Sequence, residues 1–162
     1  QSRATSAGPV TRPSPPLAAC MCGGRLWGFG GLASWNVSAF TGNTSVTTGC
    51  AIHCDGTNLY VSASTFSGNT SNVPNTDFSN HGGAIYSACY TVISNSTFYN
   101  NSALGSEGGA IYFSGNMFAG LYNATIVAHQ AQEGAAISSN HGSASGPPIS
   151  SSILSGHPHG HR

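Results

Sequence analysis

A five-residue sequence that returns at a fixed interval constrains the fold of this chain more than any other feature. The sequence GGAIY at residues 82–86 recurs unchanged at 108–112, 26 residues later, and in weaker form as GAAIS at 134–138. Earlier copies lie at 49–53 and 23–27, and the one longer step indicates a seven-residue insertion within 72–80. A repeat of this length indicates stacked supersecondary units, which become stable only by packing on their neighbours.

A second motif runs in phase with the first, and its best copies read AFTGN, TFSGN and TFYNN at residues 39–43, 65–69 and 97–101. Weaker copies lie at 125–129 and 152–156. The segments are short, rich in β-branched residues and bounded by Gly, Asn and Ser, which is typical of strands and not of helices. The leucine-rich framework of the other common repeat of this length is absent. We therefore predict an all-β fold, a right-handed parallel β-helix of about five coils with about 26 residues each.

Stacking of the coils aligns equivalent residues into inward rows at the spacing of hydrogen-bonded strands. The first predicted row holds Leu26, Ile52, Ile85, Ile111 and Ile137, and the second holds Phe40, Phe66, Phe98, Ile126 and Ile153. A third wall is expected where Leu59 and Val61 match Thr91 and Ile93, and then Ala119 and Leu121. The glycine pairs predict tight bends or close backbone approach. Asn95 and Asn123 are expected at left-handed bends.

Three parts of the chain differ in composition. Residues 1–19 hold four of the eight prolines and are expected to form an extended arm or linker. Residues 20–157 form the predicted β-helix, and residues 158–162 form a His-rich flexible tail. No stretch is apolar enough to span a membrane, and the chain lacks the leader expected of a complete precursor.

Charge is scarce and balanced, with four Arg, no Lys and four acidic residues. A protein that binds nucleic acid needs a basic patch, so nucleic acid is not an expected partner.

The pairing of GGAI at residues 82–85 with FYNN at 98–101, an F-x-x-N sequence, resembles the repeats of the chlamydial polymorphic outer membrane proteins. The resemblance covers roughly residues 23–157. It implies a passenger-like β-helix used for surface display or adhesion. The last two copies depart from the pattern, because His129 and Gly156 replace the final Asn.

Six asparagines begin the sequence N-x-S/T that accepts N-linked glycans, namely Asn36, Asn43, Asn69, Asn95, Asn100 and Asn123. If the bends of the β-helix face solvent, glycans on them clash with nothing in the core. The competing reading is that the Asn of F-x-x-N only turns the chain.

Five cysteines lie in the first 90 residues, Cys20, Cys22, Cys50, Cys54 and Cys89. Their spacing lacks the paired pattern of structural zinc sites, so disulfides in an oxidising compartment are the better reading, with one cysteine left over. Cys54 and Cys89 fall in adjacent coils within bridging range, and Cys50 is expected to reach Cys20 or Cys22.

Catalysis is not expected, and we assign no catalytic residue, metal or cofactor. Glu107 and Glu133 are predicted to stack, below a coil that offers His81 at the same place, but polysaccharide-cleaving β-helices need clustered carboxylates with a basic residue. The alternating histidines at 157–161 could bind a metal, although a flexible end is the plainer reading. Tyr86 and Tyr112 are candidates for contacts with carbohydrate.

The sequence thus predicts a secreted, extracellular or cell-surface structural glycoprotein. It is expected to self-associate into a homo-oligomer or filament through the β-helix ends or the Pro-rich arm. Expected partners are covalent glycans and a cell-surface or matrix polysaccharide. The alternative is a carbohydrate-binding or polysaccharide-degrading protein of the same fold.

Overall fold

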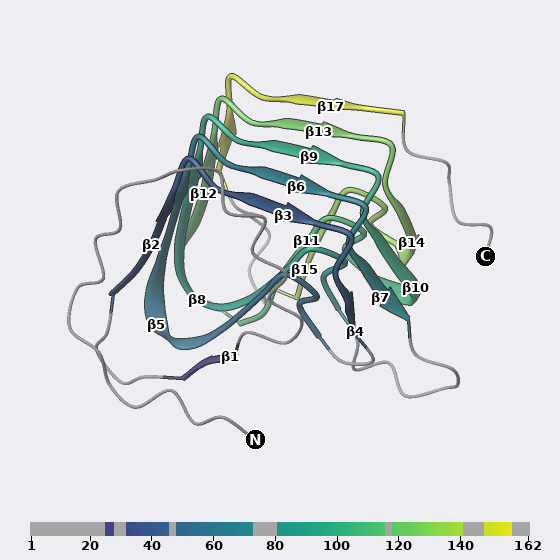
Figure 1. The fold of residues 1–162 in the computed structure, drawn as a ribbon, viewed down its shortest axis with the longest axis horizontal. Coiled ribbons are helices and arrows are strands. Elements are labelled where there is room, and N and C mark those ends of the chain that lie inside the picture. The colour runs from purple at the N-terminus through teal and green to yellow at the C-terminus, as the bar shows by residue number, and fades with distance from the viewer. Residues whose placement is uncertain are drawn as a thin grey trace.

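In the computed structural model, residues 25–27, 32–45, 48–72, 81–115, 118–140 and 148–156 are described. They form strands joined only by parallel pairings, with no helix in these ranges. Each turn of the chain lays its strands beside those of the turn before, as Figure 1 shows. The prediction of an all-β parallel solenoid is confirmed. The predicted arm at 1–19 and the tail at 158–162 lie outside the described residues.

Three sheets enclose the interior. The eight-stranded bent sheet follows the order β1 (Arg25–Trp27), β5 (Ile52–Ser62), β8 (Ile85–Ser94), β11 (Ile111–Phe113) and β15 (Ile137–Ser139). Beside this path, β2 (Leu32–Asn36) pairs with β5, β12 (Ala119–Tyr122) pairs with β8, and β16 (Ile149–Ser150) pairs with β12. The long strands β5 and β8 curve, so this one sheet forms two faces (Figure 1).

The other two sheets consist of short strands. The phenylalanine sheet contains β3 (Ala39–Thr41), β6 (Thr65–Ser67), β9 (Thr97–Tyr99), β13 (Thr125–Val127) and β17 (Ile153–Ser155). The short-strand sheet contains β4 (Thr44–Ser45), β7 (Thr70–Asn72), β10 (Ser102–Glu107) and β14 (Gln130–Glu133).

The solenoid has about four turns of about 28 residues, close to the prediction of about five coils of about 26 residues. Phe40 pairs with Phe66 at a step of 26, but Phe98 pairs with Ile126 at a step of 28. The two additional residues fall between β11 and β12, where the chain leaves the sheet instead of continuing as it does in β8. The predicted insertion falls between Asn72 and His81, outside the described residues.

Left-handed residues occupy three corners of the turn, and each corner repeats along the stack. The first corner has φ values of 48 to 52° at Val37, Ala63, Asn95, Asn123 and Ser151. The second has φ values of 51 to 68° at Gly42, Gly68, Asn100, Ala128 and Gly156, and the third holds the first glycine of each repeat. The bends predicted at Asn95 and Asn123 are confirmed, because Asn adopts this conformation at low cost.

The two glycines of each repeat have different tasks. Gly82 has a φ of 76°, which other residues rarely adopt. A Cβ on Gly83 would collide with the carbonyl oxygen of Gly109 in the next turn. Gly109 meets Ala135 in the same way, so the second glycine is required by close backbone approach, as its position in the sequence predicted.

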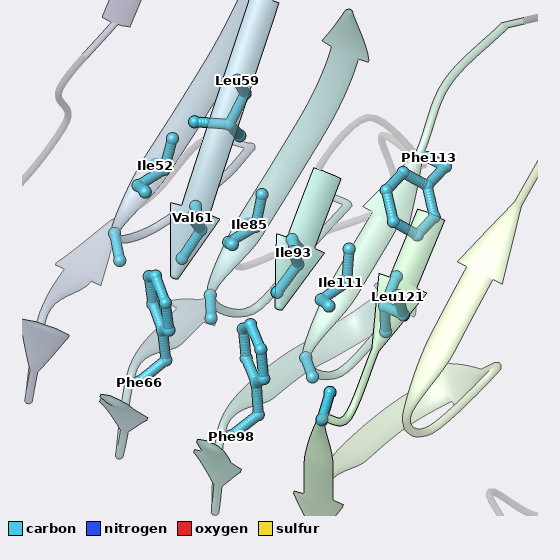
Figure 2. Packing of buried hydrophobic residues seen from close by; sticks show 14 of the residues in the cluster. Ile52, Leu59, Val61, Phe66, Ile85, Ile93, Phe98, Ile111, Phe113 and Leu121 are labelled. Carbon is cyan, nitrogen blue, oxygen red and sulfur yellow. The ribbon is translucent and has the colours of Figure 1, made fainter. Parts of the chain in front are cut away.

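The interior is filled by the predicted rows (Figure 2). The ring of Phe66 stacks between those of Phe40 and Phe98, with centroids 4.6 and 4.7 Å apart and planes within 6°. Ile85 lies opposite both Ile52 and Ile111. The third wall has the predicted register, in which Thr91 pairs with Leu59 and Ala119, and Ile93 with Val61 and Leu121.

The register at the two ends differs from the prediction. Leu26 lies opposite Cys54 and not Ile52, a shift of two residues that keeps the period-two alternation of the strand. At the other end Leu154, not Ile153, lies opposite Ile126.

A serine explains the register of the last turn. Ser152 Oγ accepts a hydrogen bond from the amide of Ala124 at 3.0 Å and donates to the carbonyl of Ser150 at 2.9 Å. Ser64 and Ser96 make the same pair of bonds two residues before their phenylalanines. The serine therefore sets the register, and the apolar residue two positions later enters the inward row.

Candidate functional site

Four of the six predicted glycan acceptors lie at exposed corners, namely Asn36, Asn95, Asn100 and Asn123. Asn95 and Asn123 occupy the same corner in neighbouring turns, and Nδ2 of Asn123 donates to Oδ1 of Asn95 across 2.6 Å. Asn36 Oδ1 accepts from the hydroxyl of Ser62 at 2.9 Å. All four side chains are accessible to solvent, as a glycan requires. Their occupancy by glycans stays a prediction.

The other two acceptors, Asn43 and Asn69, are buried, which corrects the expectation that all the sequons lie at solvent-facing bends. Nδ2 of Asn43 donates to Oδ1 of Asn69 at 2.7 Å, and Nδ2 of Asn69 donates to Oδ1 of Asn101 at 2.8 Å. A glycan would be attached through this same Nδ2 atom, which faces the interior. In the folded solenoid these asparagines form an internal ladder, so their role is structural.

Cys54 and Cys89 form a disulfide that links adjacent turns inside the core. Cys50 is also buried, and its Sγ donates to the carbonyl oxygens of Asn43 at 2.9 Å and Thr70 at 3.0 Å. The predicted link from Cys50 to Cys20 or Cys22 cannot be followed, because those two residues lie outside the described residues. A disulfide of this kind forms in an oxidising compartment.

The predicted stack of Glu107 and Glu133 is present, because the two residues pair in register between β10 and β14. The column continues as expected. Gly108 donates to the carbonyl of Glu133, Gly82 to that of Glu107 and Gly49 to that of His81, each at 3.0 or 3.1 Å.

Aromatic rings stack beside this column. His53 and Tyr86 lie 4.7 Å apart between centroids, Tyr86 and Tyr112 lie 5.7 Å apart, and His81 covers Tyr112 at 3.9 Å. Tyr112 points outward but is only 4% exposed, so it is not an open platform for a sugar ring. The Tyr86 and Tyr112 pair therefore acts mainly in packing.

Burial dominates the electrostatics of this cluster. It lowers the pKa of His81, against the opposing effect of the Glu107 carboxylate. Burial also raises the pKa of Tyr112, and Glu107 and Tyr86 add to that rise. Both rings are therefore held in their neutral forms near neutral pH.

The geometry offers little for catalysis. Ser106 Oγ lies 3.0 Å from His81 Nδ1, but Ser106 is buried and cannot meet a substrate. Glu107 accepts a hydrogen bond from Ser138 Oγ at 2.8 Å. Among the described residues, no group of three His, Cys, Asp or Glu side chains is placed to hold a metal ion.

Sequence reasoning missed an aromatic stripe on the outer face of the bent sheet, formed by Tyr60, Tyr90, Phe118 and Tyr122. The ring of Tyr90 lies 6.0 Å from that of Tyr60 and 5.0 Å from that of Phe118. The period-two alternation of β5 and β8 carried the signal, because residues between the inward positions must point outward. These aromatic residues do not recur at the repeat interval of 26 residues, so the repeat pattern does not reveal them.

The parallel pairing, the recurring left-handed corners and the internal asparagine ladder together define a β-solenoid repeat protein of the parallel β-helix class. Two segments, residues 63–88 and 95–116, match the family model of the Chlamydia polymorphic membrane protein repeat. The chain is a parallel β-helix protein with repeats of this type. No curated protein and no solved structure matches the chain.

Proteins of the matched polymorphic membrane protein family are outer-membrane or surface proteins, and the two matched segments fit that class. Within the described ranges, no helix has both the length and the apolar character needed to cross a membrane.

Proposed function

We propose that this chain is a structural and adhesive solenoid displayed outside the cell, that it associates end to end with further copies, and that it is not an enzyme. The family match supports display at the surface, and the internal disulfide supports an oxidising compartment. The four exposed acceptors, at Asn36, Asn95, Asn100 and Asn123, are where glycans would be carried.

One observation carries the proposal of self-association. The inward row is fully buried at Phe40, Phe66, Phe98 and Ile126, but Leu154, which continues this row in β17, is 43% exposed. Strand β17 pairs with β13, and its opposite edge has no partner among the described strands. A further turn would cover the leucine and pair the edge, and a second copy supplies such a turn.

The non-enzymatic role is supported by the chemistry of the column of polar residues formed by His81, Glu107 and Glu133. Its carboxylate at Glu107 is engaged by Ser138, and its histidine at position 81 is stacked on Tyr112 and bonded to buried Ser106. These side chains already have partners that hold the turns together, so they are positioned as structural groups.

The experiment measures the molar mass of the purified chain by light scattering over a range of concentrations. We expect the mass to rise with concentration, and we expect filaments by electron microscopy. Leu154→Asp should abolish the rise, because a charge at this end opposes burial against another turn.

Leu104→Asp is the matched control. Leu104 is 44% exposed but lies in β10, away from the end of the inward row, so its variant should assemble as the parent does. A parent that stays monomeric at every concentration, or two variants with equal effect, would overturn end-to-end association. Surface display is tested separately, by labelling intact cells with a membrane-impermeant reagent.

A further inference from the structure

The aromatic stripe crosses three successive turns of the solenoid. Tyr60 belongs to β5 and Tyr90 to β8, whereas Phe118 directly precedes β12 and Tyr122 is its last residue. Each neighbours a buried inward residue, as Tyr60 does between Leu59 and Val61. The stripe therefore stands on the outside of a fully packed wall, and the core is complete without it.

Phe118 is the most exposed residue of the stripe, and Tyr60 and Tyr122 are 38% and 36% exposed. Phe118 is 46% exposed although it stacks on Tyr90. A Cβ on Gly120 would lie only 2.8 Å from both Cε2 and the hydroxyl oxygen of Tyr122, so this side chain covers the backbone at Gly120. The Tyr122 side chain thus lies over the sheet at Gly120 and remains partly open to solvent.

The surroundings of the stripe are mostly polar. The residues opposite or beside it on the outer face are Ser34, Asn58, Ser62, Val92 and Ser94. Hydroxyl and amide groups therefore border the aromatic rings, and no Lys, Arg, Asp or Glu lies among these positions.

We propose that the aromatic stripe binds a neutral polysaccharide. A pyranose ring has an apolar C–H face, which packs on an aromatic ring, and a rim of hydroxyls, which suits the tyrosine, serine and asparagine groups. Charge matching selects this occupant. A polyanionic glycan needs cations, which this face does not offer. A protein partner would bury the serine hydroxyls and the asparagine amide of this face away from water, which costs free energy unless each group is hydrogen-bonded.

This inference rests on the proposed function in one respect only, namely that the chain is displayed outside the cell, where it can meet the polysaccharide. The rings of Tyr60, Tyr90 and Phe118 follow one another on successive turns, so an extended polymer laid along the stripe would meet them in sequence.

The test uses the purified chain and soluble hexasaccharides of β-1,4-glucan, β-1,3-glucan, chitin and mannan, with heparin as the polyanionic probe. Titration by calorimetry should show binding of at least one neutral hexasaccharide and none of heparin. Phe118→Ala and Tyr122→Ala should each weaken that binding at least about tenfold. Gly120→Ala should weaken it as well, because its Cβ displaces the Tyr122 ring without removing an aromatic residue.

Tyr99→Ala is the matched control, because Tyr99 is 54% exposed but lies on β9 in the phenylalanine sheet. Its affinity should equal that of the parent, and thermal unfolding of each variant confirms that the solenoid is intact. The proposal is overturned if no neutral hexasaccharide binds, if heparin alone binds, or if the stripe variants bind as Tyr99→Ala does. Loss of glycan binding with normal surface labelling refutes this inference alone, and the reverse result refutes display alone.

Discussion

The side chain of Asn69 donates a hydrogen bond from Nδ2 to Oδ1 of Asn101 across 2.8 Å, and this bond joins two successive turns inside the solenoid. Oδ1 of Asn101 also accepts from the backbone amide of Asn69 at 2.9 Å, and Nδ2 of Asn69 also donates to the carbonyl of Phe40 at 3.0 Å. The side-chain amides of Asn69 and Asn101 therefore satisfy both side-chain and backbone groups at a buried corner.

Removal of this amide should be costly. Asn69→Ala leaves the Phe40 carbonyl and the Asn43 amide without their partner, so we expect the free energy of unfolding to fall by about 3 kcal/mol. Urea unfolding monitored by circular dichroism measures the change. Asn100→Gly is the control, because this exposed neighbour has a φ of 51° that glycine adopts freely, and its stability should stay near that of the parent. Equal stability of Asn69→Ala and the parent would contradict the structural role of the ladder.

The first corner offers a stabilising substitution. Ala63 has a φ of 48°, which costs an alanine about 1 kcal/mol, whereas Asn95 and Asn123 hold the same place in later turns. Ala63→Asn should therefore raise the free energy of unfolding by up to about 1 kcal/mol. The reverse change, Asn95→Ala, should lower it by a similar amount, and both are read from urea midpoints. A variant Ala63→Asn that unfolds earlier than the parent would argue against this corner conformation.

The disulfide should stabilise the adjacent turns. Cys54 and Cys89 are separated by 35 residues. Closure of a loop of that length lowers the conformational entropy of the unfolded chain and thereby stabilises the folded state by about 4 kcal/mol. The double variant Cys54→Ala/Cys89→Ala should lose stability on that scale in non-reducing urea unfolding. Dithiothreitol should destabilise the parent more than the double variant. An equal response of both proteins would mean that another cystine, and not this bridge, carries the effect.

Stability should depend on pH through His81. Its pKa is lowered in the folded protein from the ordinary 6.5, so the unfolded chain binds the proton more readily. Stability is therefore complete above pH 6.5 and is lost as the pH falls from there toward the folded pKa. His81→Phe keeps a ring on Tyr112 but cannot titrate, so its urea midpoint should vary less between about pH 5 and pH 7. Parallel pH profiles for the parent and this variant would exclude a contribution from His81.

Tyr112 should act at the alkaline end. Burial raises its pKa above the ordinary 10.0, so the folded state retains a proton that the unfolded state releases. Stability should fall as the pH rises above 10, and Tyr112→Phe should remove that part of the fall. Thermal unfolding at increasing pH provides the measurement. If Tyr112→Phe loses stability as steeply as the parent, the tyrosine does not carry this dependence.

Several features of the fold could be read from the sequence because they repeat. Gly83 and Gly109 recur in the sequence because each stacked turn brings a carbonyl to the place that a Cβ would fill. The match of Thr91 with Leu59 and Ala119 was also predictable, since residues inside a closed wall are paired on both sides and their spacing is constrained. The register at the two ends was less predictable, because a shift of two residues at Leu26 keeps the strand alternation, and the shift of one residue at Ile153 follows from the hydrogen bonds of Ser152.

The polar sites were harder to read. Asn69 and Asn100 are one residue apart in their motifs and both begin a sequon, but the first is buried and the second is exposed. The difference depends on whether the side chain at that position of the corner points into the solenoid or toward solvent. The aromatic stripe was missed for a related reason, because Tyr60 pairs with Val92 and not with another aromatic residue.

The sequence by itself determined the repeat, the parallel solenoid, the inward Phe and Ile rows and the cysteines within bridging range. These follow from periodicity, because each turn can bury its apolar residues only by stacking on another. Only the tertiary structure decided which asparagines are buried, where the final register falls and which aromatic residues share the outer face. These depend on corner geometry and on contacts between turns, which residues distant in sequence create together and which no local pattern records.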